Sequence, residues 1–376
     1  MQVWYGSEQV PARLTDPRDA GTVVTVGIFD GVHRGHQAIL ARVVERARRM
    51  ARPGGERPMA VAVTFDPHPV LVHRPEAHMP MVASLADRLE ALAATGLDAV
   101  LVVHYTLDFA DQGPEEFVRT WLEGLLAARA VVVGEDVRFG RGNSGDAAGL
   151  ELPGRAGGLA VEIVDDVRSP SGRRWSSTWV RELLQAGDMQ GAAEVLGHVH
   201  RLRGTVVHGR RRGRELGFPT ANLDAASAGV VPPDGVYAGW LVRSPGAAAL
   251  SGAAGRSPRE ERLPAAISIG TNPTFDDVPQ RTVEAHVLGR ADLDLYGEVV
   301  AIELVDLLRP MLASAVTPAT GAVMPAAAEA LSKLLALLGA HVHPAFMHPP
   351  PGVPHAKHAR PKTEAAEQDP RQRQNP

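Results

Sequence analysis

Short apolar runs alternate with amphipathic segments over the first half of the chain. Because the runs are short and rich in β-branched residues, they predict buried strands over residues 22–30, 59–67, 97–105, 128–136 and 158–167. Between them, apolar positions recur at helical spacing, which predicts helices over 33–51, 82–96 and 113–127. Strands that alternate with helices predict an α/β fold with a parallel sheet covered on both faces.

The pattern changes near residue 200. Residues 177–197 predict a pair of helices. After them, Gly and Pro punctuate short strand-like runs with no helix between, and these runs are 203–209, 234–243, 263–270, 281–288 and 298–309. This part predicts a small antiparallel β-barrel, with a sandwich as the alternative.

The change of pattern divides the chain into parts, as a length of 376 residues also suggests. We expect a first domain over 1–186, a linker helix over 187–200 and a second domain over 201–310. The C-terminal extension, 311–376, is rich in Ala, Pro and His and has little to bury. We therefore expect it to be largely disordered from about residue 341.

Composition narrows the function classes. The net charge of −4 argues against a general affinity for nucleic acid or for an anionic membrane. The sequence contains no cysteine, which excludes disulfides, thiol catalysis and cysteine-ligated metal sites. No signal peptide or run long enough to span a bilayer is visible, so we expect a cytoplasmic protein with small-molecule partners. The oligomeric state stays open.

The stretch "GIFDGVHRGHQAIL", which begins at Gly27, follows the first apolar run and opens a helix. His33 and His36 lie three residues apart and share one face of the helix start. Helix N-termini attract phosphate, and imidazoles donate hydrogen bonds to phosphate oxygens. With glycines on both sides, the stretch predicts a nucleoside triphosphate site rather than two unrelated surface histidines.

The same residues resemble a known signature. "GIFDGVHRGH" is similar to the nucleotide-binding element of the nucleotidyltransferase superfamily, and in this longer form it resembles bacterial bifunctional riboflavin kinases/FAD synthetases. Three later segments fit that family: "TFDPHP" from Thr64, "VVVGEDVRFG" from Val131 and "RWSSTWVRELLQAGD" from Arg174. The resemblance implies a Rossmann-like FMN adenylyltransferase domain followed by a riboflavin kinase barrel.

The resemblance also implies roles for residues of the first domain. It assigns catalysis to His33, His36 and Arg181. It implies that ATP and its phosphates are bound by Gly27, Phe29, Asp30, Gly31, Gly35, Ser177 and Thr178. It implies that the flavin is bound by Asp66, His68, Pro69 and Asp136.

A second specific stretch, "RGTVVHGRRRGRELGFPTANL", begins at Arg203. Thr220 and Asn222 are two residues apart, so on an extended segment they point the same way. Their oxygens suit Mg²⁺ better than the alternative, Zn²⁺. The stretch resembles the riboflavin kinase signature, in which this Thr and Asn hold the metal and the nucleotide phosphates. The resemblance implies that the phosphate-binding flap is formed by Gly209, Gly213 and Arg214.

Glu284 lies in the strand-like run "TVEAHVL". The matching residue of the family accepts the proton of the ribityl hydroxyl, and a carboxylate beside an attacking hydroxyl is typical of phosphoryl transfer. A surface glutamate paired with a cation is the plainer interpretation, and the neighbouring "FPTAN" and "GTNPTF" favour the base.

The resemblance implies two ATP-dependent, Mg²⁺-dependent reactions, from riboflavin to FMN and from FMN to FAD. It stops after "LLRP", which ends at Pro310, where the family continues with an acidic and aromatic stretch and a helix. The residues that follow suggest a shifted reading frame. Two alternatives therefore stay open. One is another small-molecule nucleotidyltransferase, and the other is a flavin-binding protein with a defective kinase domain.

Overall fold

The structure is a computed structural model. It describes residues 1–16, 20–51, 55–77, 79–150, 159–208, 220–224, 228–243, 260–272, 280–290 and 292–310. The predictions for Gly209, Gly213 and Arg214 and for the extension 311–376 lie outside the described residues.

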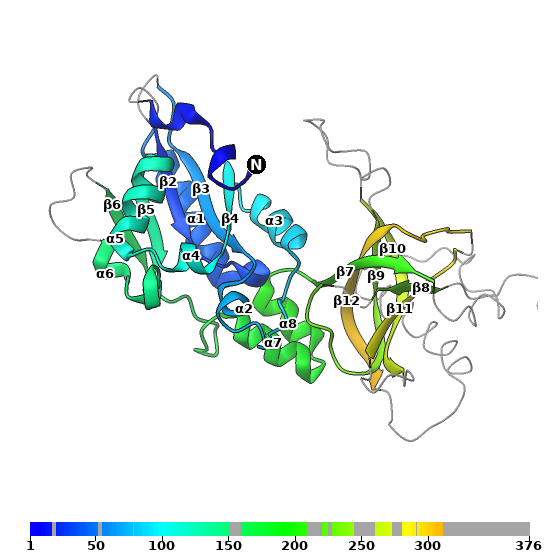
Figure 1. Cartoon of the computed structure of the whole chain (residues 1–376). Coiled ribbons are helices and arrows are strands. Elements are labelled where there is room, and N and C mark those ends of the chain that lie inside the picture. Colours follow the sequence, from blue (N-terminus) through cyan, green and yellow to red (C-terminus); the bar gives the residue numbers. More distant parts are fainter. Residues whose placement is uncertain are drawn as a thin grey trace, which may run out of the picture. The chain divides into compact units, whose positions relative to one another are not determined.

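The first part of the chain is built on one parallel sheet, as the alternating pattern predicts (Figure 1). Its six strands lie in the order β1-β4-β3-β2-β5-β6, and every neighbouring pair is parallel. The strands are β1 (Gln2–Tyr5), β2 (Thr22–Val26), β3 (Met59–Asp66), β4 (Ala99–His104), β5 (Ala128–Gly134) and β6 (Ala160–Val164).

Two details of this sheet differ from the sequence prediction. The edge strand β1 was not predicted, because only Trp4 of its four residues is buried and the apolar signal is weak. The strand β2 ends at Val26 and not at Asp30, because Phe29 takes a left-handed conformation that a strand cannot continue.

Helices cover both faces of the sheet. Successive residues of a strand point to opposite faces, so Val23 packs with Leu40 of α1 while Val24 packs with Leu122 on the other side. The helices of the first part are α1 (Arg34–Arg49), α2 (Pro69–His73), α3 (Leu85–Ala93), α4 (Leu107–Ala110), α5 (Pro114–Phe117) and α6 (Ala147–Leu150). Two further helices, α7 (Ser177–Ala186) and α8 (Met189–Leu196), bury their apolar side chains in the same cluster as the barrel core. A π-helical stretch, η4 (Val118–Leu125), continues α5, and 3₁₀ turns are η1 (Ser7–Gln9), η2 (Ala12–Thr15), η3 (Asp30–Val32) and η5 (Arg141–Asn143).

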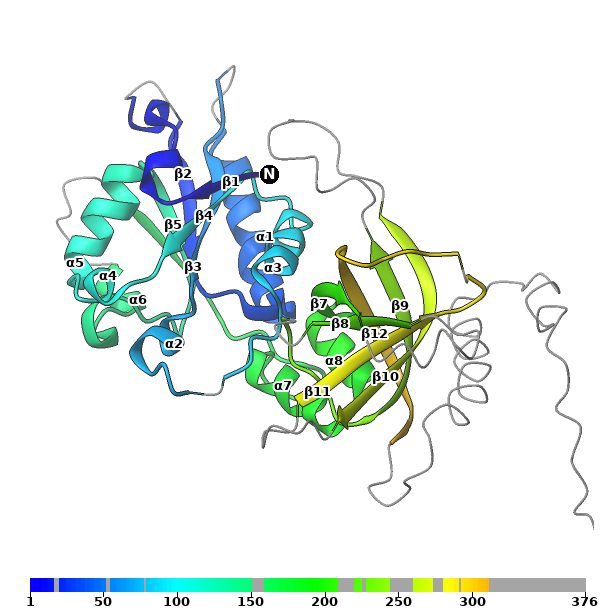
Figure 2. The same cartoon turned by 45° about the vertical axis from the view of Figure 1, so that its right-hand side comes forward.

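The later part of the chain forms a closed barrel, so the alternative of a sandwich is excluded (Figure 2). The order around it is β10-β11-β8-β7-β12-β9, and all neighbouring strands are antiparallel. The strands are β7 (His200–Val207), β8 (Thr220–Leu223), β9 (Gly235–Arg243), β10 (Glu261–Asn272), β11 (Gln280–Val287) and β12 (Val299–Pro310).

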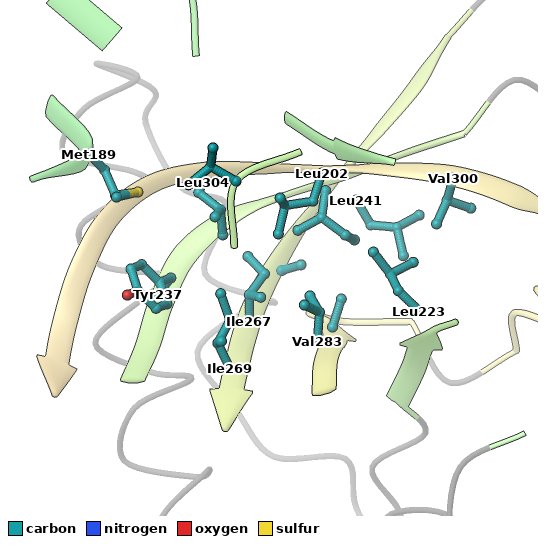
Figure 3. Close-up of a cluster of buried hydrophobic side chains, with 14 of the residues drawn as sticks. Met189, Leu202, Leu223, Tyr237, Leu241, Ile267, Ile269, Val283, Val300 and Leu304 are labelled. Atoms are coloured by element: carbon teal, nitrogen blue, oxygen red, sulfur yellow. The ribbon is translucent and has the colours of Figure 1, made fainter. Parts of the chain in front are cut away.

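Aliphatic side chains from all six strands fill the barrel (Figure 3). Leu202, Leu241, Ile267 and Val300 are all fully buried there, and Met189 of α8 belongs to the same cluster. The inward residues leave their neighbours along each strand on the outer face of the barrel. Polar side chains of the barrel strands that could contact a substrate therefore lie on this outer face.

Candidate active sites

The loop between β2 and α1 carries the histidine signature and lies at the carboxyl edge of the parallel sheet, where ligands of such sheets bind. Two of its residues other than glycine, Phe29 (φ 54°) and Val32 (φ 43°), have left-handed backbone. A left-handed β-branched residue is strained, and such strain persists only where surrounding packing imposes it. The strain thus indicates a loop held in one shape.

The rings of His33 and His36 lie face to face at the start of α1. Their centroids are 3.6 Å apart and the rings are inclined by 21°. His33 is also the N-cap of the helix, because its Nδ1 accepts a hydrogen bond of 3.3 Å from the backbone N–H of His36. The proton of a neutral His33 therefore sits on Nε2, where it can be donated to a ligand. The structure brings the two predicted imidazoles together.

Both histidines are neutral in this protein near pH 7. Burial, with a contribution from Arg174, lowers the pKa of His33 to about 4. Burial, together with the charges of His33 and Arg174, lowers the pKa of His36 well below its usual value. Neutral rings can stack at this distance without repulsion, and each keeps one N–H to donate.

The glycines of the signature make room for the protein's own side chains. A Cβ on Gly31, whose φ is 75°, would lie 2.8 Å from Cγ1 of Val82. A Cβ on Gly35 would lie 3.1 Å from the ring of His33. A Cβ on Gly27 would lie 3.0 Å from the ring of Phe29. Internal packing therefore disfavours a side chain at Gly31 and leaves little room for one at Gly27 and Gly35, and their contact with ATP stays a prediction.

Asp30 joins the histidine loop to α7. Its carboxylate is 3 % exposed and accepts hydrogen bonds from the backbone N–H groups of Val82 (3.1 Å) and Ala83 (3.2 Å). The same carboxylate forms an ion pair with Arg181, whose Nε also donates to the carbonyl of Pro80. Arg181 is therefore held beside the loop by a buried anion, and Asp30 presents no open carboxylate to a ligand.

The predicted hydroxyls lie at the first turn of α7. Ser177 Oγ donates to the carbonyl of Asp30 over 2.9 Å, which fixes the helix against the histidine loop. Thr178 is exposed at the same turn. Ser176, which the sequence reasoning did not assign, is the N-cap and accepts from the N–H of Trp179.

Arg174 is a cation that sequence reasoning missed. It forms ion pairs with Asp136, at the end of β5, and with Asp166 over 2.9 Å. Its charge also acts on both His33 and His36, where it disfavours protonation. A signal in the sequence could have identified Arg174, because it begins the segment that resembles the family. An arginine that follows another arginine, however, looks like an ordinary surface cation. Asp136, predicted to bind flavin, pairs with this arginine and does not line the cavity described next.

A cavity of about 220 Å³ opens at the carboxyl edge of the sheet, beside Gly27 and Ile28. Aromatic rings from four separate segments line it. The rings of Phe65, Tyr105 and Phe109 meet edge to face or tilted, with centroids 5.4–5.7 Å apart. The other lining rings are Phe117 and Phe139. Such a wall suits a flat aromatic ring system.

Polar side chains also line this cavity, among them Arg138 and Asn143. His68 and Pro69, both predicted from the sequence, line it at the start of α2. Gln112 lines it too, and its Oε1 accepts a hydrogen bond of 3.0 Å from the indole N–H of Trp121. That bond leaves the amide N–H₂ of Gln112 as a donor. The remaining predicted flavin residue, Asp66, lies at the end of β3 with one carboxylate oxygen 3.4 Å from Nη2 of Arg88.

The second candidate site lies on the outer face of the barrel. Asn222 of β8 is paired directly with Glu284 of β11, so the two side chains leave the sheet on the same side. Thr220 lies two residues before Asn222 and shares that face, and its Oγ1 is 3.3 Å from the Asn222 amide nitrogen. Burial raises the pKa of Glu284, as a proton acceptor for a hydroxyl requires.

The three side chains provide hydroxyl, amide and carboxylate oxygens, which is the donor chemistry of a magnesium site. Within the described residues, no cluster of three or more His, Asp or Glu is arranged to hold a metal by itself. A metal on this face would therefore complete its coordination with the phosphate oxygens of a nucleotide and with water.

Comparison with known proteins matches the two parts of the chain to two family models. A family model described as FAD synthetase matches residues 15–179, and one described as riboflavin kinase matches residues 196–316. The proteins named bifunctional riboflavin kinase/FMN adenylyltransferase from Listeria monocytogenes and Escherichia coli are each 33 % identical to this chain. The first similarity covers 80 % of this chain and 88 % of the relative, and the second covers 77 % and 85 %.

A solved structure described as a macrolide-efflux protein from Streptococcus pneumoniae has the same fold. It superposes with a TM-score of 0.69 at 26 % identity, over 89 % of this chain and 99 % of that one. Among the helices that the structure describes, none has the length and apolar character needed to cross a membrane. The two matching models and the relatives, each covered over most of its length, identify the chain as a member of the bifunctional riboflavin kinase/FMN adenylyltransferase family.

Proposed function

We propose that the parallel-sheet part of this chain transfers AMP from ATP to FMN, and that the barrel transfers the γ-phosphoryl group of ATP to riboflavin. The observation that carries the first assignment is the stacked pair of His33 and His36 at the edge of the sheet that also holds the aromatic cavity. A phosphate site beside a flat aromatic cavity matches the two ends of FMN.

In the first reaction, a phosphate oxygen of FMN attacks the α-phosphorus of ATP, and the bond to pyrophosphate breaks. No covalent protein intermediate is needed, so positioning and charge stabilisation supply the catalysis. Nε2–H of His33 and the ring N–H of His36 donate to phosphate oxygens. Arg181, held by Asp30, stabilises the charge that develops on the departing pyrophosphate.

In the second reaction, the ribityl hydroxyl attacks the γ-phosphorus of ATP and ADP leaves. Glu284 accepts the proton of that hydroxyl, which its raised pKa favours. Thr220 and Asn222 would hold Mg²⁺, which supplies positive charge to the phosphate oxygens when it is bound. The cytoplasmic location and the boundaries of the two domains stay predictions from the sequence.

The direct test is to incubate the protein with ATP, Mg²⁺ and riboflavin or FMN and to separate the products by chromatography. FMN and FAD from riboflavin, with FAD and pyrophosphate from FMN, are the expected products. FAD from FMN without FMN from riboflavin would indicate the alternative of a defective kinase domain. Flavin binding with no product at all would contradict both assignments.

A further inference from the structure

Arg88 is a buried cation that the mechanism above does not use. It lies on α3, only 1 % exposed, and its guanidinium faces the ends of two strands of the parallel sheet. Nη1 donates to the carbonyl of Ile28 over 3.0 Å, and Nη2 donates to the carbonyl of Phe65 over 3.2 Å. Nη2 also contacts a carboxylate oxygen of Asp66 at 3.4 Å. One side chain thus holds three acceptors.

These acceptors belong to the two segments that approach the substrates. Ile28 lies in the histidine loop, two residues before Asp30, and it lines the aromatic cavity. Phe65 and Asp66 end β3, and Asp66 lies two residues before His68. The planar guanidinium has donors in a fixed fork, so it sets the distance between the two segments and not only their proximity. Arg88 therefore cross-links the phosphate side of the site to the flavin side.

Burial makes the charged form of Arg88 less favourable than it would be in water. Burial lowers the pKa of Arg88, while Asp66 and Asp30 both favour its charged form. Among the described residues, its Nε atom is buried without a hydrogen-bond partner. An apolar side chain of similar volume would avoid that cost, and replacing buried charges in this way is often neutral or stabilising. Stability alone thus gives weak reason for an arginine at this position.

Two arginines and two aspartates lie close together in this region, with each arginine beside an aspartate. Arg181 pairs with Asp30, and Arg88 contacts Asp66 while its charge also acts on Asp30. His68, which lines the cavity, lies within the influence of both arginines. The arrangement places two cations, each beside a carboxylate, where the flavin and phosphate segments meet.

We propose that Arg88 is a positioning residue for adenylyl transfer, because it fixes the histidine loop relative to the segment from Asp66 to Pro69. The proposal rests on the function proposed above. Removal of the fork lets the two segments shift relative to each other, so FMN binds less well and lies out of line with the α-phosphate. Small displacements of this kind cost large factors in rate.

The test compares Arg88→Met with a matched control, Thr64→Val. Thr64 is fully buried beside Arg88, and its Oγ1 donates to the same carbonyl, that of Ile28, over 3.0 Å. The control therefore perturbs the same acceptor and the same core without removing the fork. The readouts are kcat and KM for FMN in FAD formation, the rate of riboflavin phosphorylation, and the midpoint of thermal unfolding.

We expect Arg88→Met to lower kcat/KM for FMN by about 100-fold, with KM raised about tenfold, while riboflavin phosphorylation is unchanged. Thr64→Val should change KM for FMN by less than about threefold. A loss of folded protein reduces the amount of active enzyme but does not change KM. An unchanged KM in Arg88→Met, or an equal loss of both activities, would therefore overturn the proposal.

If Arg88→Met does not fold, the variant Arg88→Lys tests the positioning role in its place. It keeps the charge but cannot reach three acceptors at once, so KM for FMN should still rise by about threefold to tenfold. A wild-type KM in this variant would contradict the positioning role. A wild-type protein that makes no FAD from FMN would instead contradict the proposed function itself, and the inference with it.

Discussion

The imidazole of His33 lies flat on that of His36, with 3.6 Å between the ring centroids, while its Nδ1 caps the helix that carries His36. Each ring therefore fixes the other. The capping bond sets the tautomer of His33. At this distance the two rings cannot both be protonated without strong electrostatic repulsion. Two neutral hydrogen-bond donors at a helix N-terminus are suited to bind an anion and to take up a proton when it arrives.

The first prediction concerns catalysis by this pair. His36→Ala should lower FAD formation from FMN by about 100-fold or more, because it removes a ring N–H that donates a hydrogen bond to phosphate at the site of adenylyl transfer. The same variant should convert riboflavin to FMN at the wild-type rate, since His36 lies outside the barrel. Product chromatography measures both. Equal loss of the two activities in a folded variant would contradict the assignment of two sites.

The second prediction concerns proton uptake. The pKa of His33 is about 4 in the free protein, below the usual value of about 6.5, and bound phosphates will raise it. ATP binding at pH 5 to 6 should therefore take up a fraction of a proton, so the affinity for ATP should increase as the pH falls through this range. Calorimetry in buffers of different ionisation enthalpy measures the uptake. ATP exchanges protons itself, so the comparison is with His33→Asn, and identical uptake in both proteins would contradict the prediction.

The third prediction concerns the polar wall of the aromatic cavity. The indole N–H of Trp121 occupies Oε1 of Gln112, so the amide N–H₂ is the group offered to a flat ligand. Gln112→Leu should weaken FMN binding by about tenfold through loss of one hydrogen bond, and it should also lower stability, because the part-buried indole N–H of Trp121 loses its acceptor. Quenching of flavin fluorescence measures the affinity. Trp121→Phe is the control, because it frees the amide to turn over and should weaken binding by less. Unchanged affinity in Gln112→Leu would show that the amide does not touch the ligand.

The local parts of both sites could be predicted because they are contiguous in sequence. The strand, glycine turn and helix start around His33 and His36 lie within one short segment, and the alternation of Thr220 and Asn222 follows from the two-residue repeat of a strand. Short strands without intervening helices also predicted the antiparallel second part, while the choice between a barrel and a sandwich needed the structure.

Features assembled from distant segments could not be predicted in this way. The cavity rings Phe65, Tyr105, Phe109 and Phe139 each read as an ordinary core residue, and only the fold brings them together. Arg88 reads as the charged face of an amphipathic helix, and only the structure shows it buried between two strand ends. The edge strand β1 is too short, with one buried side chain, to show a pattern.

The fourth prediction concerns the buried ion pair of Asp30 and Arg181. Asp30→Asn keeps the shape, but its single amide oxygen can accept from only one of the N–H groups of Val82 and Ala83, which donate to different oxygens of the carboxylate, and it no longer balances the guanidinium. We expect FAD formation to fall by about tenfold to 100-fold and the free energy of unfolding to fall by about 1–3 kcal/mol. Kinetics and denaturant unfolding measure the two effects. A variant with full activity would show that Arg181 does not need this anion to act.

The last prediction separates the barrel from the first site. Glu284→Gln keeps the size of the side chain but removes the proton acceptor beside Asn222, so FMN formation from riboflavin should fall by about 100-fold or more. Added FMN should still be converted to FAD. Glu261→Gln is the matched control, because Glu261 is a half-buried glutamate of the neighbouring strand β10 that pairs with Arg243 and Arg290, and it should leave both reactions unchanged.

The raised pKa of Glu284 adds a second test, since the rate of phosphorylation should increase with pH as this carboxyl loses its proton. The same ascending limb in Glu284→Gln would assign the titration to another group and would leave Glu284 without a role as the base.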